Sequence, residues 1–537
     1  MRALRRLIVL AAALAAAAPA AAQTATATTA ADPNALVRPT ELDVPPFGHR
    51  LTPRQALEIA RRVPRIADML ARHRGYTEEA YEKGVTRWQV SYFDAGEPRR
   101  EIGQVLIDDA SGAVLEAWTG HQVAWTMARG YPGAFGRSAT SLWIWIPLCV
   151  LFVLPFVALR RRRSIVHLDV LVLVGFSVSL AFFNQANIGM SVPLAYPLLV
   201  YLLGRMLWIA LRRGRRIAPH RLLVPVSWLA VGLVFLVGFR VGLNATSSNV
   251  IDVGYSGVIG ADLLADGEPL YGNFPSDNEH GDTYGPVNYL AYVPFEQVVP
   301  WSGRWDDLPA AHGAAVVFDL LCLLLLFLIG RRVRGPDLGI VLAYAWAAYP
   351  FTLYVANSNA NDSLVAALVL LCVLLSERPL LRGGAAALAG LTKFAPLALA
   401  PVLATHRGRT GLARFAIGFA VVAALAGLPL LREDLSDFYD RTLGFQAGRD
   451  SPFSIWGLYG WETARDVATA LAVLLAVVLA LVPRRRDVAG LAAACAAVLI
   501  GLQLAVSHWF YLYIPWFFGL VMIAVLAGPD RDEAAAG

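Results

Sequence analysis

Charge, lysine and cysteine are all scarce in this chain of 537 residues. Charged side chains make up 16% of it, whereas soluble domains carry about 25%. The four cysteines all lie inside apolar runs, so they offer neither loop-stapling disulfides nor a metal-binding cluster. Lys83 and Lys393 are its two lysines, and the net charge of +6 therefore comes from arginine. These shortages exclude a disulfide-stapled scaffold, a disordered chain and an ordinary soluble enzyme.

Long apolar runs dominate the sequence instead. Hydrophobic residues make up 57% of the chain, and the mean hydropathy is +0.53. Repeated windows of about 20 apolar residues indicate a polytopic membrane protein. An isoelectric point near 9.2 also occurs in nucleic-acid-binding proteins, but here the arginines stand in short blocks between apolar runs. That arrangement is typical of the cytoplasmic loops of membrane proteins.

Eleven apolar runs are the candidate membrane spans. Arginine blocks follow the first, third, fifth and ninth runs, and the positive-inside rule assigns such blocks to the cytoplasm. The N-terminus and the two longest loops, 244–310 and 432–463, are then expected outside. The runs lie at 140–159, 165–186, 193–211, 222–243, 311–330, 337–356, 361–376, 411–431, 464–482, 488–507 and 510–527, and the arginine blocks at 160–163, 212–216, 331–334 and 484–486.

The segment 383–404 is expected to enter the membrane and return. Arginines flank it on both sides, so both of its ends favour the cytoplasm. Gly390 and Pro396 interrupt its middle. We therefore predict a re-entrant pair of half-helices, a path that is tolerated only where protein or water surrounds the backbone. The predicted fold class is an all-α polytopic membrane protein of about eleven transmembrane helices plus this hairpin.

The first residues have the features of a processed leader. Residues 1–22 carry the arginines, the apolar stretch and the small residues of a secretory signal, and an uncleaved anchor is the alternative. Residues 23–47 are rich in Ala, Thr and Pro, which is typical of a flexible tether.

Residues 48–130 predict a small α+β extracytoplasmic domain. Thr52 caps a helix, and strands are expected at 88–93, 104–108 and 113–118. The phrase QVLIDDASGAVLEAWTG resembles a PepSY-like domain, which implies that this part binds or inhibits a partner. A folded spacer or partner-binding module without catalytic groups is the simpler interpretation.

Three candidate site regions fall on the expected outer side. In a helix, Asp252, Tyr255 and Asp262 share one face just beyond the fourth run, although a loop acid is more often merely solvated. The following loop holds acidic residues and a histidine that suit a divalent cation, but no strong metal motif, so a hydrated loop explains them equally well. These four are Asp277, Glu279, His280 and Asp282. Tyr284 then begins the turn toward the membrane.

The phrase NSNANDS, residues 357–363, lies at the outer junction of two runs. Asn359, Asn361 and Asp362 can hydrogen-bond sugar hydroxyls, or Asn361 or Asp362 can simply cap a helix. Both interpretations stay open.

Lys393 needs a reason, because an ammonium at the centre of a bilayer costs about 2.5–3.5 kcal/mol on insertion scales. An anion such as a lipid phosphate offsets that cost, and snorkelling to the cytoplasmic surface is the alternative. The expected depth of Lys393 on the cytoplasmic side argues against contact with an outer active site.

Further polar groups stand in the last outer segments. Arg441 and Arg449 suit a phosphate. His508 lies at the outer junction of the last two runs, where a histidine is more often an interfacial hydrogen-bonding group than a catalyst. Tyr271 and the tryptophans at 301 and 456 are candidates for stacking on sugar faces.

Four phrases, in their order and spacing, resemble the polytopic enzymes of glycosyltransferase family 87. They are DVGYSGVIGADLLADGEPLYGNF, YGPVNYLAYVPF, LAGLTKFAPLALAPVL and DSPFSIWGLYGW. The resemblance covers roughly residues 220–525 and implies a GT-C fold, with 217–530 as the catalytic membrane core and 138–216 as accessory helices. It implies a polyprenyl-phosphate sugar as the donor, Asp252 as the catalytic base and an outer histidine that His508 matches loosely.

The predicted function is transfer of a hexose, mannose by the family's implication, from a polyprenyl phosphate to an extracytoplasmic glycan or glycolipid, with inversion. The predicted location is the plasma membrane. No cofactor is implied with certainty, and a divalent cation is left open. Two alternatives are a transporter or flippase of a lipid-linked substrate and a non-catalytic sensor. The predicted substrate-binding residues are Tyr255, Asp262, Tyr271, Tyr284, Asn359, Asp362, Arg441, Arg449 and His508, with Lys393 for the donor's phosphate.

Overall fold

The chain divides into two compact units, Met1–Ala124 and Trp125–Gly537. The computed structural model describes residues 36–130, 133–157, 164–212, 221–406, 408, 411–449, 451–482, 485 and 487–527. The expected signal at 1–22 and most of the expected tether lie outside these residues. So do the arginines at 160–163 and most of those in the blocks at 212–216 and 484–486.

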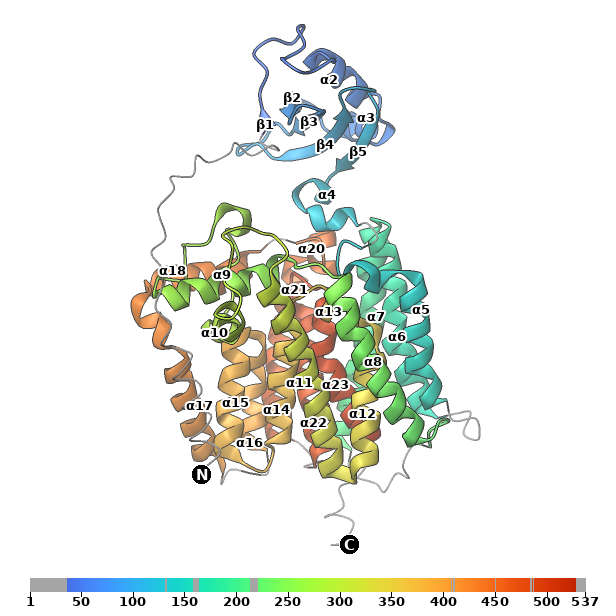
Figure 1. Ribbon diagram of the computed structural model, residues 1–537, viewed down its shortest axis with the longest axis vertical. Coiled ribbons are helices and arrows are strands. Elements are labelled where there is room, and N and C mark those ends of the chain that lie inside the picture. The colour runs from blue at the N-terminus through green and yellow to red at the C-terminus, as the bar shows by residue number, and fades with distance from the viewer. Residues whose placement is uncertain are drawn as a thin grey trace. The chain divides into compact units, whose positions relative to one another are not determined.

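The described part of the first unit is an antiparallel five-stranded sheet with two nine-residue helices and a short third one (Figure 1). The strands follow one another in sequence order, as in a meander. The predicted helix and three strands are confirmed, whereas β1, α3, β2 and α4 were not predicted. The elements are β1 (Leu36–Val37), α2 (Pro53–Arg61), α3 (Pro64–Arg72), β2 (Thr77–Lys83), β3 (Arg87–Phe93), β4 (Glu101–Asp108), β5 (Val114–Thr119) and the short α4 (His121–Ala124).

The local sequence explains this unit. The Gln55 backbone N–H donates to the hydroxyl of Thr52, and the Thr52 backbone N–H donates to the side-chain oxygen of Gln55, which makes a capping box for α2. Pro53 occupies the first helical position, where a missing N–H costs nothing. The alternating apolar residues of β4 bury Val105 and Ile107 with Trp88 of β3.

The second unit is a helical bundle. Its elements are η1 (Thr126–Arg129), η2 (Arg137–Thr140), α5 (Leu142–Val153), η3 (Leu154–Phe156), α6 (Ile165–Asn184), α7 (Ile188–Leu211), α8 (Val226–Thr246), α9 (Asp252–Asp266), η4 (Ser276–Asn278), α10 (Pro286–Glu296), α11 (Pro309–Arg334), α12 (Pro336–Ala348), α13 (Pro350–Asn357), α14 (Asp362–Leu374), α15 (Pro379–Thr392), η5 (Ala395–Leu399), α16 (Ala400–Thr405), α17 (Leu412–Ala426), η7 (Leu428–Arg432), α18 (Leu435–Tyr439), η8 (Asp440–Gly444), α19 (Phe445–Gly448), α20 (Ile455–Tyr459), α21 (Glu462–Leu481), α22 (Val488–Ala505), η9 (Tyr511–Tyr513) and α23 (Ile514–Leu526).

Six described helices are long and apolar enough to cross a membrane: α6, α7, α8, α11, α21 and α22. The run at 337–356 forms a seventh only if α12 and α13, which bend by 60°, count as one broken span. The other four runs give shorter apolar helices, because prolines, 3-10 turns or polar ends interrupt them. The chain is therefore a multi-pass membrane protein by length and composition, and the predicted count of eleven spans is not reached among the described residues.

Two buried ion pairs lie inside the bundle. The Arg240 guanidinium of α8 donates to both carboxylate oxygens of Asp319 in α11, at 2.6 and 2.9 Å. Arg205 of α7 pairs with Asp169 of α6 at 3.0 Å. Such charges are tolerated away from water because each has an opposite charge and hydrogen bonds.

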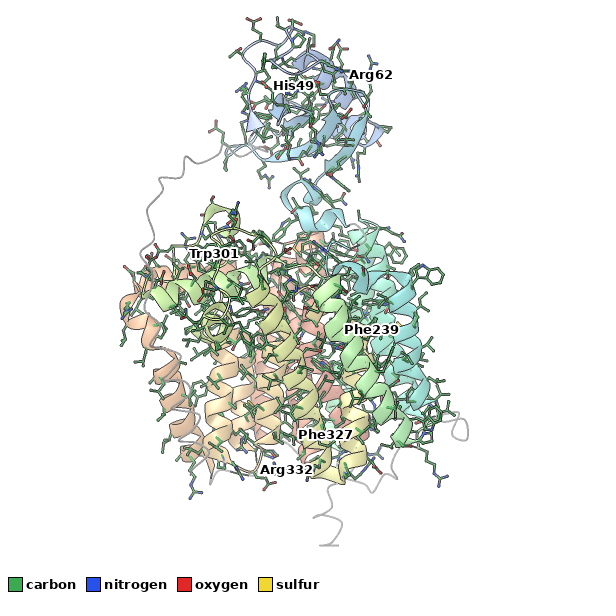
Figure 2. All side chains as sticks on the ribbon, in the orientation of Figure 1. His49, Arg62, Phe239, Trp301, Phe327 and Arg332 are labelled. Atoms are coloured by element: carbon green, nitrogen blue, oxygen red, sulfur yellow. The ribbon has the colours of Figure 1, made fainter. Side chains whose placement is uncertain are left out.

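The bundle has two distinct ends. In Figure 2, Trp301, from the long loop before α11, lies at one end, and Arg332, at the close of α11, lies at the other. The helices α9 and α18 lie across the Trp301 end (Figure 1). The arginine block at 331–334 and the long acidic loops are therefore at opposite ends of the bundle.

The segment 379–405 runs into the bundle from the Arg332 end and returns. Glu377, just before α15, pairs with Arg332 at 3.2 Å, and Figure 1 places α16 at the same lower end. Between α15 and η5 lies Lys393, which caps α15. This path has the form of the predicted hairpin, with Lys393 at its tip.

Candidate functional site

The tip of the hairpin meets a loop from the opposite end of the bundle. The backbone N–H of Gly285 donates to the Thr392 carbonyl at 3.2 Å. A side chain on Gly285 would clash with the backbone of Leu391, so glycine is needed for this close approach. The contact brings Tyr284 beside Lys393, whose Nζ lies 5.2 Å from the centre of the tyrosine ring.

Lys393 is ion-paired. Its Nζ donates to Asp362 Oδ1 at 2.7 Å, and the Trp516 indole donates to the same oxygen at 2.9 Å. Asp362 is fully buried at the first position of α14, and its Oδ2 has no hydrogen-bond partner in the described part of the chain. The rings of Tyr284, Tyr513 and Trp516 surround the ammonium at 5.2 to 5.5 Å.

The expectation that Lys393 lies apart from the outer residues is therefore wrong. From the sequence, the tip of the hairpin was expected at a depth on the cytoplasmic side of the membrane. Snorkelling of Lys393 to the cytoplasmic surface was the alternative to an ion pair with an anion. In the structure the tip reaches the segment expected outside, because Asp362 supplies the negative charge that the ammonium needs.

Arg449 brings a second positive charge to this region. Its guanidinium lies over the rings of Trp125 and Phe445, at 5.1 and 5.6 Å. Its Nε is buried without a hydrogen-bond partner, and no salt bridge joins it to a carboxylate among the described residues. An anion is the natural partner for such a group.

His508 lies against the same tryptophan, with its ring centre 5.6 Å from that of Trp125. Its Nδ1 lies 2.9 Å from the hydroxyl of Ser451. Burial, together with the nearby charges of Arg449 and Lys393, holds the pKa of His508 well below its usual range. The imidazole is thus neutral near pH 7 and offers a hydrogen bond without a charge.

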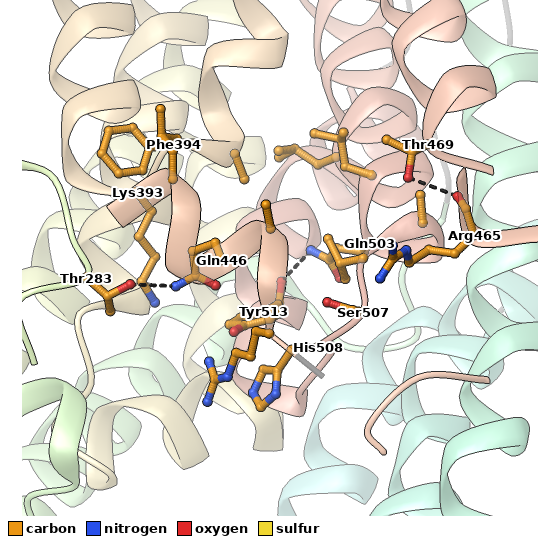
Figure 3. Close-up of a pocket in the computed structure, with 18 of the residues that line it drawn as sticks. Thr283, Lys393, Phe394, Gln446, Arg465, Thr469, Gln503, Ser507, His508 and Tyr513 are labelled. Atoms are coloured by element: carbon orange, nitrogen blue, oxygen red, sulfur yellow. Dashed lines mark hydrogen bonds between the residues drawn. The ribbon is translucent and has the colours of Figure 1, made fainter. Parts of the chain in front are cut away.

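Tyr284, Lys393, Arg449 and His508 line a cavity of about 420 Å³ (Figure 3). One part of its wall is polar, with Lys393, Arg449, Gln446, His508 and the charged side chain of Arg465. The other part is apolar and comes largely from α22 and the segment after it, with Leu499, Leu502 and Val506. Gln446 donates to Thr283 at 2.8 Å and thereby holds α19 against the loop before α10. The cavity combines cationic groups with a surface suited to hydrocarbon.

Asp252 lies beside this cavity and not in its wall. It is the first residue of α9, where a carboxylate is favoured by the helix dipole. Its side chain is exposed, yet protein surrounds it closely, and this desolvation raises the pKa of Asp252. The charges of Arg449 and Lys393 and the Val253 backbone act in the opposite direction. Asp252 is therefore an accessible carboxylate with a raised pKa and two cations within electrostatic range.

Several predicted site residues lie elsewhere. The Tyr255 hydroxyl donates to Asp277 at 3.2 Å, and its ring stacks on Trp305. Asp262 is partly buried near Glu296, and burial raises its pKa to about 6. The hydroxyl of Tyr271 donates to the Tyr284 carbonyl. Among the predicted substrate-binding residues, the structure thus brings Tyr284, Asp362, Arg449 and His508 together with Lys393.

Two further predicted residues make structural contacts. The amide nitrogen of Asn359 donates to Ser248 and the Asn249 carbonyl, and its oxygen accepts from Asn244, so both of its N–H donors are used inside the bundle. Arg441 lies 3.7 Å from Asp282, and Asp282 also accepts from the Gly272 backbone.

The acidic loop does not gather a metal site. No group of three or more histidine, cysteine, aspartate or glutamate side chains is placed to hold a metal ion in the described ranges. His280 instead stacks on Phe445.

Sequence reasoning missed several members of the site. Trp125 and Ser451 are distant in sequence from the residues they hold, Arg449 and His508, and no local pattern marks them. Trp516, which donates to Asp362, stands in an aromatic run in which His508 alone was a predicted site residue. Arg465 could have been recognised from the sequence as a candidate site residue, because a charged side chain within the first two turns of an apolar helix is unusual in lipid.

Comparison with known proteins gives one result for the membrane unit. No curated protein matches the chain. The model of Glycosyltransferase family 87 matches residues 283–507, a segment that contains the cavity-lining residues from Thr283 to Ser507. This match disfavours the transporter and sensor alternatives. By the match of residues 283–507 to the model of glycosyltransferase family 87, the protein is a membrane-embedded glycosyltransferase.

Proposed function

We propose that the enzyme transfers a hexose, mannose in the first instance, from a polyprenyl phosphate to a hydroxyl of a glycan or glycolipid. The observation that carries this proposal is the accessible, raised-pKa carboxylate of Asp252 next to a cavity with an apolar wall and a cationic wall, in which Arg449 has no carboxylate partner among the described residues. A nucleotide sugar has no hydrocarbon chain that would pack on the apolar wall. A polyprenyl phosphate needs both kinds of surface.

In this mechanism Asp252 is the general base. Its carboxylate takes the proton of the acceptor hydroxyl while the hydroxyl oxygen forms a bond to the anomeric carbon. The bond from that carbon to the phosphate oxygen breaks, and its electron pair leaves with the lipid phosphate. One displacement inverts the configuration. General-base catalysis of this kind contributes about 10²–10⁴-fold.

Arg449 and Lys393 stabilise the leaving phosphate. Arg449 has no carboxylate partner among the described residues, so a phosphate gives its guanidinium the bidentate partner it prefers. Lys393 is already paired with Asp362 and contributes a weaker field. Neutral His508 adds a hydrogen bond.

We also propose that the site and the first unit are extracytoplasmic, and that the first unit is a PepSY-like module that binds a partner. The support is the separation of the arginine block at 331–334 from the long acidic loops, at opposite ends of the bundle. Ser302, exposed in the loop before α11, is a suitable reporter. In intact cells, Ser302→Cys should react with a membrane-impermeant maleimide, and protection until the cells are lysed would refute this orientation.

Transfer is tested with the purified full chain in lipid nanodiscs. The donors are polyprenyl-phosphate mannose and, separately, GDP-mannose, and the acceptor is octyl α-mannoside. We expect product from the lipid donor alone, with NMR reporting an inverted anomeric configuration. Asp252→Asn should lower the rate by about 10²–10⁴-fold. Asp266→Asn, at the exposed far end of the same helix, is the matched control and should keep full activity.

Two results would contradict the proposal. Product from GDP-mannose alone would remove the lipid donor, and turnover near the wild-type rate in Asp252→Asn would remove the general base.

A further inference from the structure

A second, larger hollow opens on the bundle at the end that carries α9. Its volume is about 690 Å³, within the usual range of about 300–1,000 Å³ for ligand pockets. Its wall comes from η2, the end of α8, the loop before α11 and the first turn of α11. None of its lining residues lines the cavity that contains Lys393 and Arg449.

Trp305 gives this hollow a fixed aromatic surface. Its indole is 43% exposed, and the Tyr255 ring stacks beneath it with the ring centres 4.9 Å apart. The indole N–H donates to the Val250 carbonyl at 3.1 Å, which fixes the orientation of the ring. A rigid indole with an open face is the surface on which the C–H face of a sugar ring packs.

Carboxylate and amide oxygens surround this indole. Asp306 accepts hydrogen bonds from the Ser302 hydroxyl at 2.6 Å and the Leu308 backbone at 3.1 Å, and these bonds hold its pKa below the usual range. The exposed carboxylate of Asp307 adds acceptors. The buried Oδ1 of Asn249 has no partner in the described residues.

The cationic group of the hollow is Arg137. No carboxylate forms an ion pair with Arg137 among the described residues. Arg137, which lines the hollow, and Leu308, which stands between the lining residues Asp307 and Pro309, both have φ of 43°, an unfavourable conformation for a residue with a side chain. Strained backbone of this kind is found at ligand-binding positions more often than elsewhere.

The mixture of groups selects the ligand class. Two carboxylates repel a phosphate or another anion, and Arg137 repels a cation. A neutral polyol has hydroxyls that donate to the carboxylates and accept from the guanidinium, and its apolar ring face covers the indole. We propose that this second hollow binds a neutral oligosaccharide.

The position of the hollow relates it to the catalytic site. Val250, which accepts the Trp305 hydrogen bond, stands two residues before Asp252. A glycan held on Trp305 therefore lies close to the segment that leads into α9 and carries the base. That the bound oligosaccharide is the acceptor chain rests on the proposed function; that the hollow binds an oligosaccharide does not.

Binding is measured without transfer, on the full chain in nanodiscs, by saturation-transfer-difference NMR and tryptophan fluorescence. The probes are mannotetraose, maltotetraose and cellotetraose. We expect at least one of them to bind at millimolar concentration. Asp307→Ala and Trp305→Phe should each weaken that binding about tenfold, the effect of losing one hydrogen bond or contact.

Matched controls separate this inference from the proposed function. Trp461→Phe changes a tryptophan of similar exposure, 53%, outside the hollow and should leave binding unchanged. Asp252→Asn should lower the transfer rate by about 10²–10⁴-fold and keep tetrasaccharide binding. Absence of binding by all three tetrasaccharides overturns the inference, and so does binding that neither Asp307→Ala nor Trp305→Phe weakens. Tetrasaccharide binding by a protein that transfers no sugar would refute the proposed function alone.

Discussion

The pair formed by Lys393 and Asp362 gives a sharp quantitative prediction. The perturbation is Lys393→Met, which keeps most of the side chain's volume and removes its charge. Asp362, with no exposed surface, then keeps one donor, the Trp516 indole at 2.9 Å, and loses the ammonium at 2.7 Å. Its Oδ2 already has no partner in the described chain.

The size of the effect follows from this burial. Removing one partner of a buried ion pair typically costs about 3–5 kcal/mol, because the remaining charge is left without compensation. We expect a loss of that size in the free energy of unfolding. Asp362→Asn should cost less, since its amide oxygen still accepts from Trp516. The double variant should lose less than the sum of the two, with a coupling energy of about 2 kcal/mol or more.

The measurement is unfolding by SDS in mixed micelles, followed by tryptophan fluorescence. Lys83→Met, which removes the other lysine of the chain from the first unit, is the control, and we expect it to change stability by less than about 1 kcal/mol. A free energy of unfolding of Lys393→Met within about 1 kcal/mol of the wild-type value would refute the reasoning, because a buried carboxylate without a counter-charge destabilises the folded state by more than that.

Three further predictions follow from the charges. Since desolvation raises the pKa of Asp252, the acidic limb of kcat/KM should have its midpoint above the ordinary aspartate pKa of 3.8, which a pH–rate profile measures. Any contribution of Asp252 to the free energy of unfolding should decline as the pH rises through this raised pKa, which unfolding at several pH values measures. Arg449→Gln should raise KM for the lipid donor about tenfold or more while octyl mannoside KM stays constant, as steady-state kinetics can show. Arg240→Met should destabilise the bundle by about 3–5 kcal/mol, and adding Asp319→Leu should recover most of that loss in the same SDS titration.

The sequence predicted much of the fold because local patterns determined it. The capping box at Thr52, the alternating residues of β4 and the runs of α6 and α11 all have short-range signals. The predicted count of about eleven spans is not confirmed, because the sequence pattern gives apolar content without the length of each helix. The run at 510–527, for example, contains a 3-10 turn near its start and yields a short helix.

The site was less predictable, since its contacts join distant parts of the chain. Asp362 was recognised as a polar residue at a junction, and Lys393 as a charge in need of an anion, but neither pattern indicated that each was the other's partner. Asn359 was an equally good candidate for binding a sugar, yet its side-chain amide makes three hydrogen bonds inside the bundle. Residue type gave the chemistry available, and only tertiary contacts decided which groups were already satisfied.

The two aspartates at helix N-termini illustrate that distinction. Asp252 and Asp362 each begin a helix, and each has Lys393 in its surroundings. Asp362 is sealed from solvent and holds the ammonium and the Trp516 indole, so it cannot approach a substrate. Asp252 is open to solvent, and its negative charge is balanced only at a distance. A base must exchange a proton with a bound hydroxyl, which requires access more than it requires a partner. Environment, and not residue type, is therefore the basis on which we propose Asp252 for proton transfer and Asp362 for holding the cation in place.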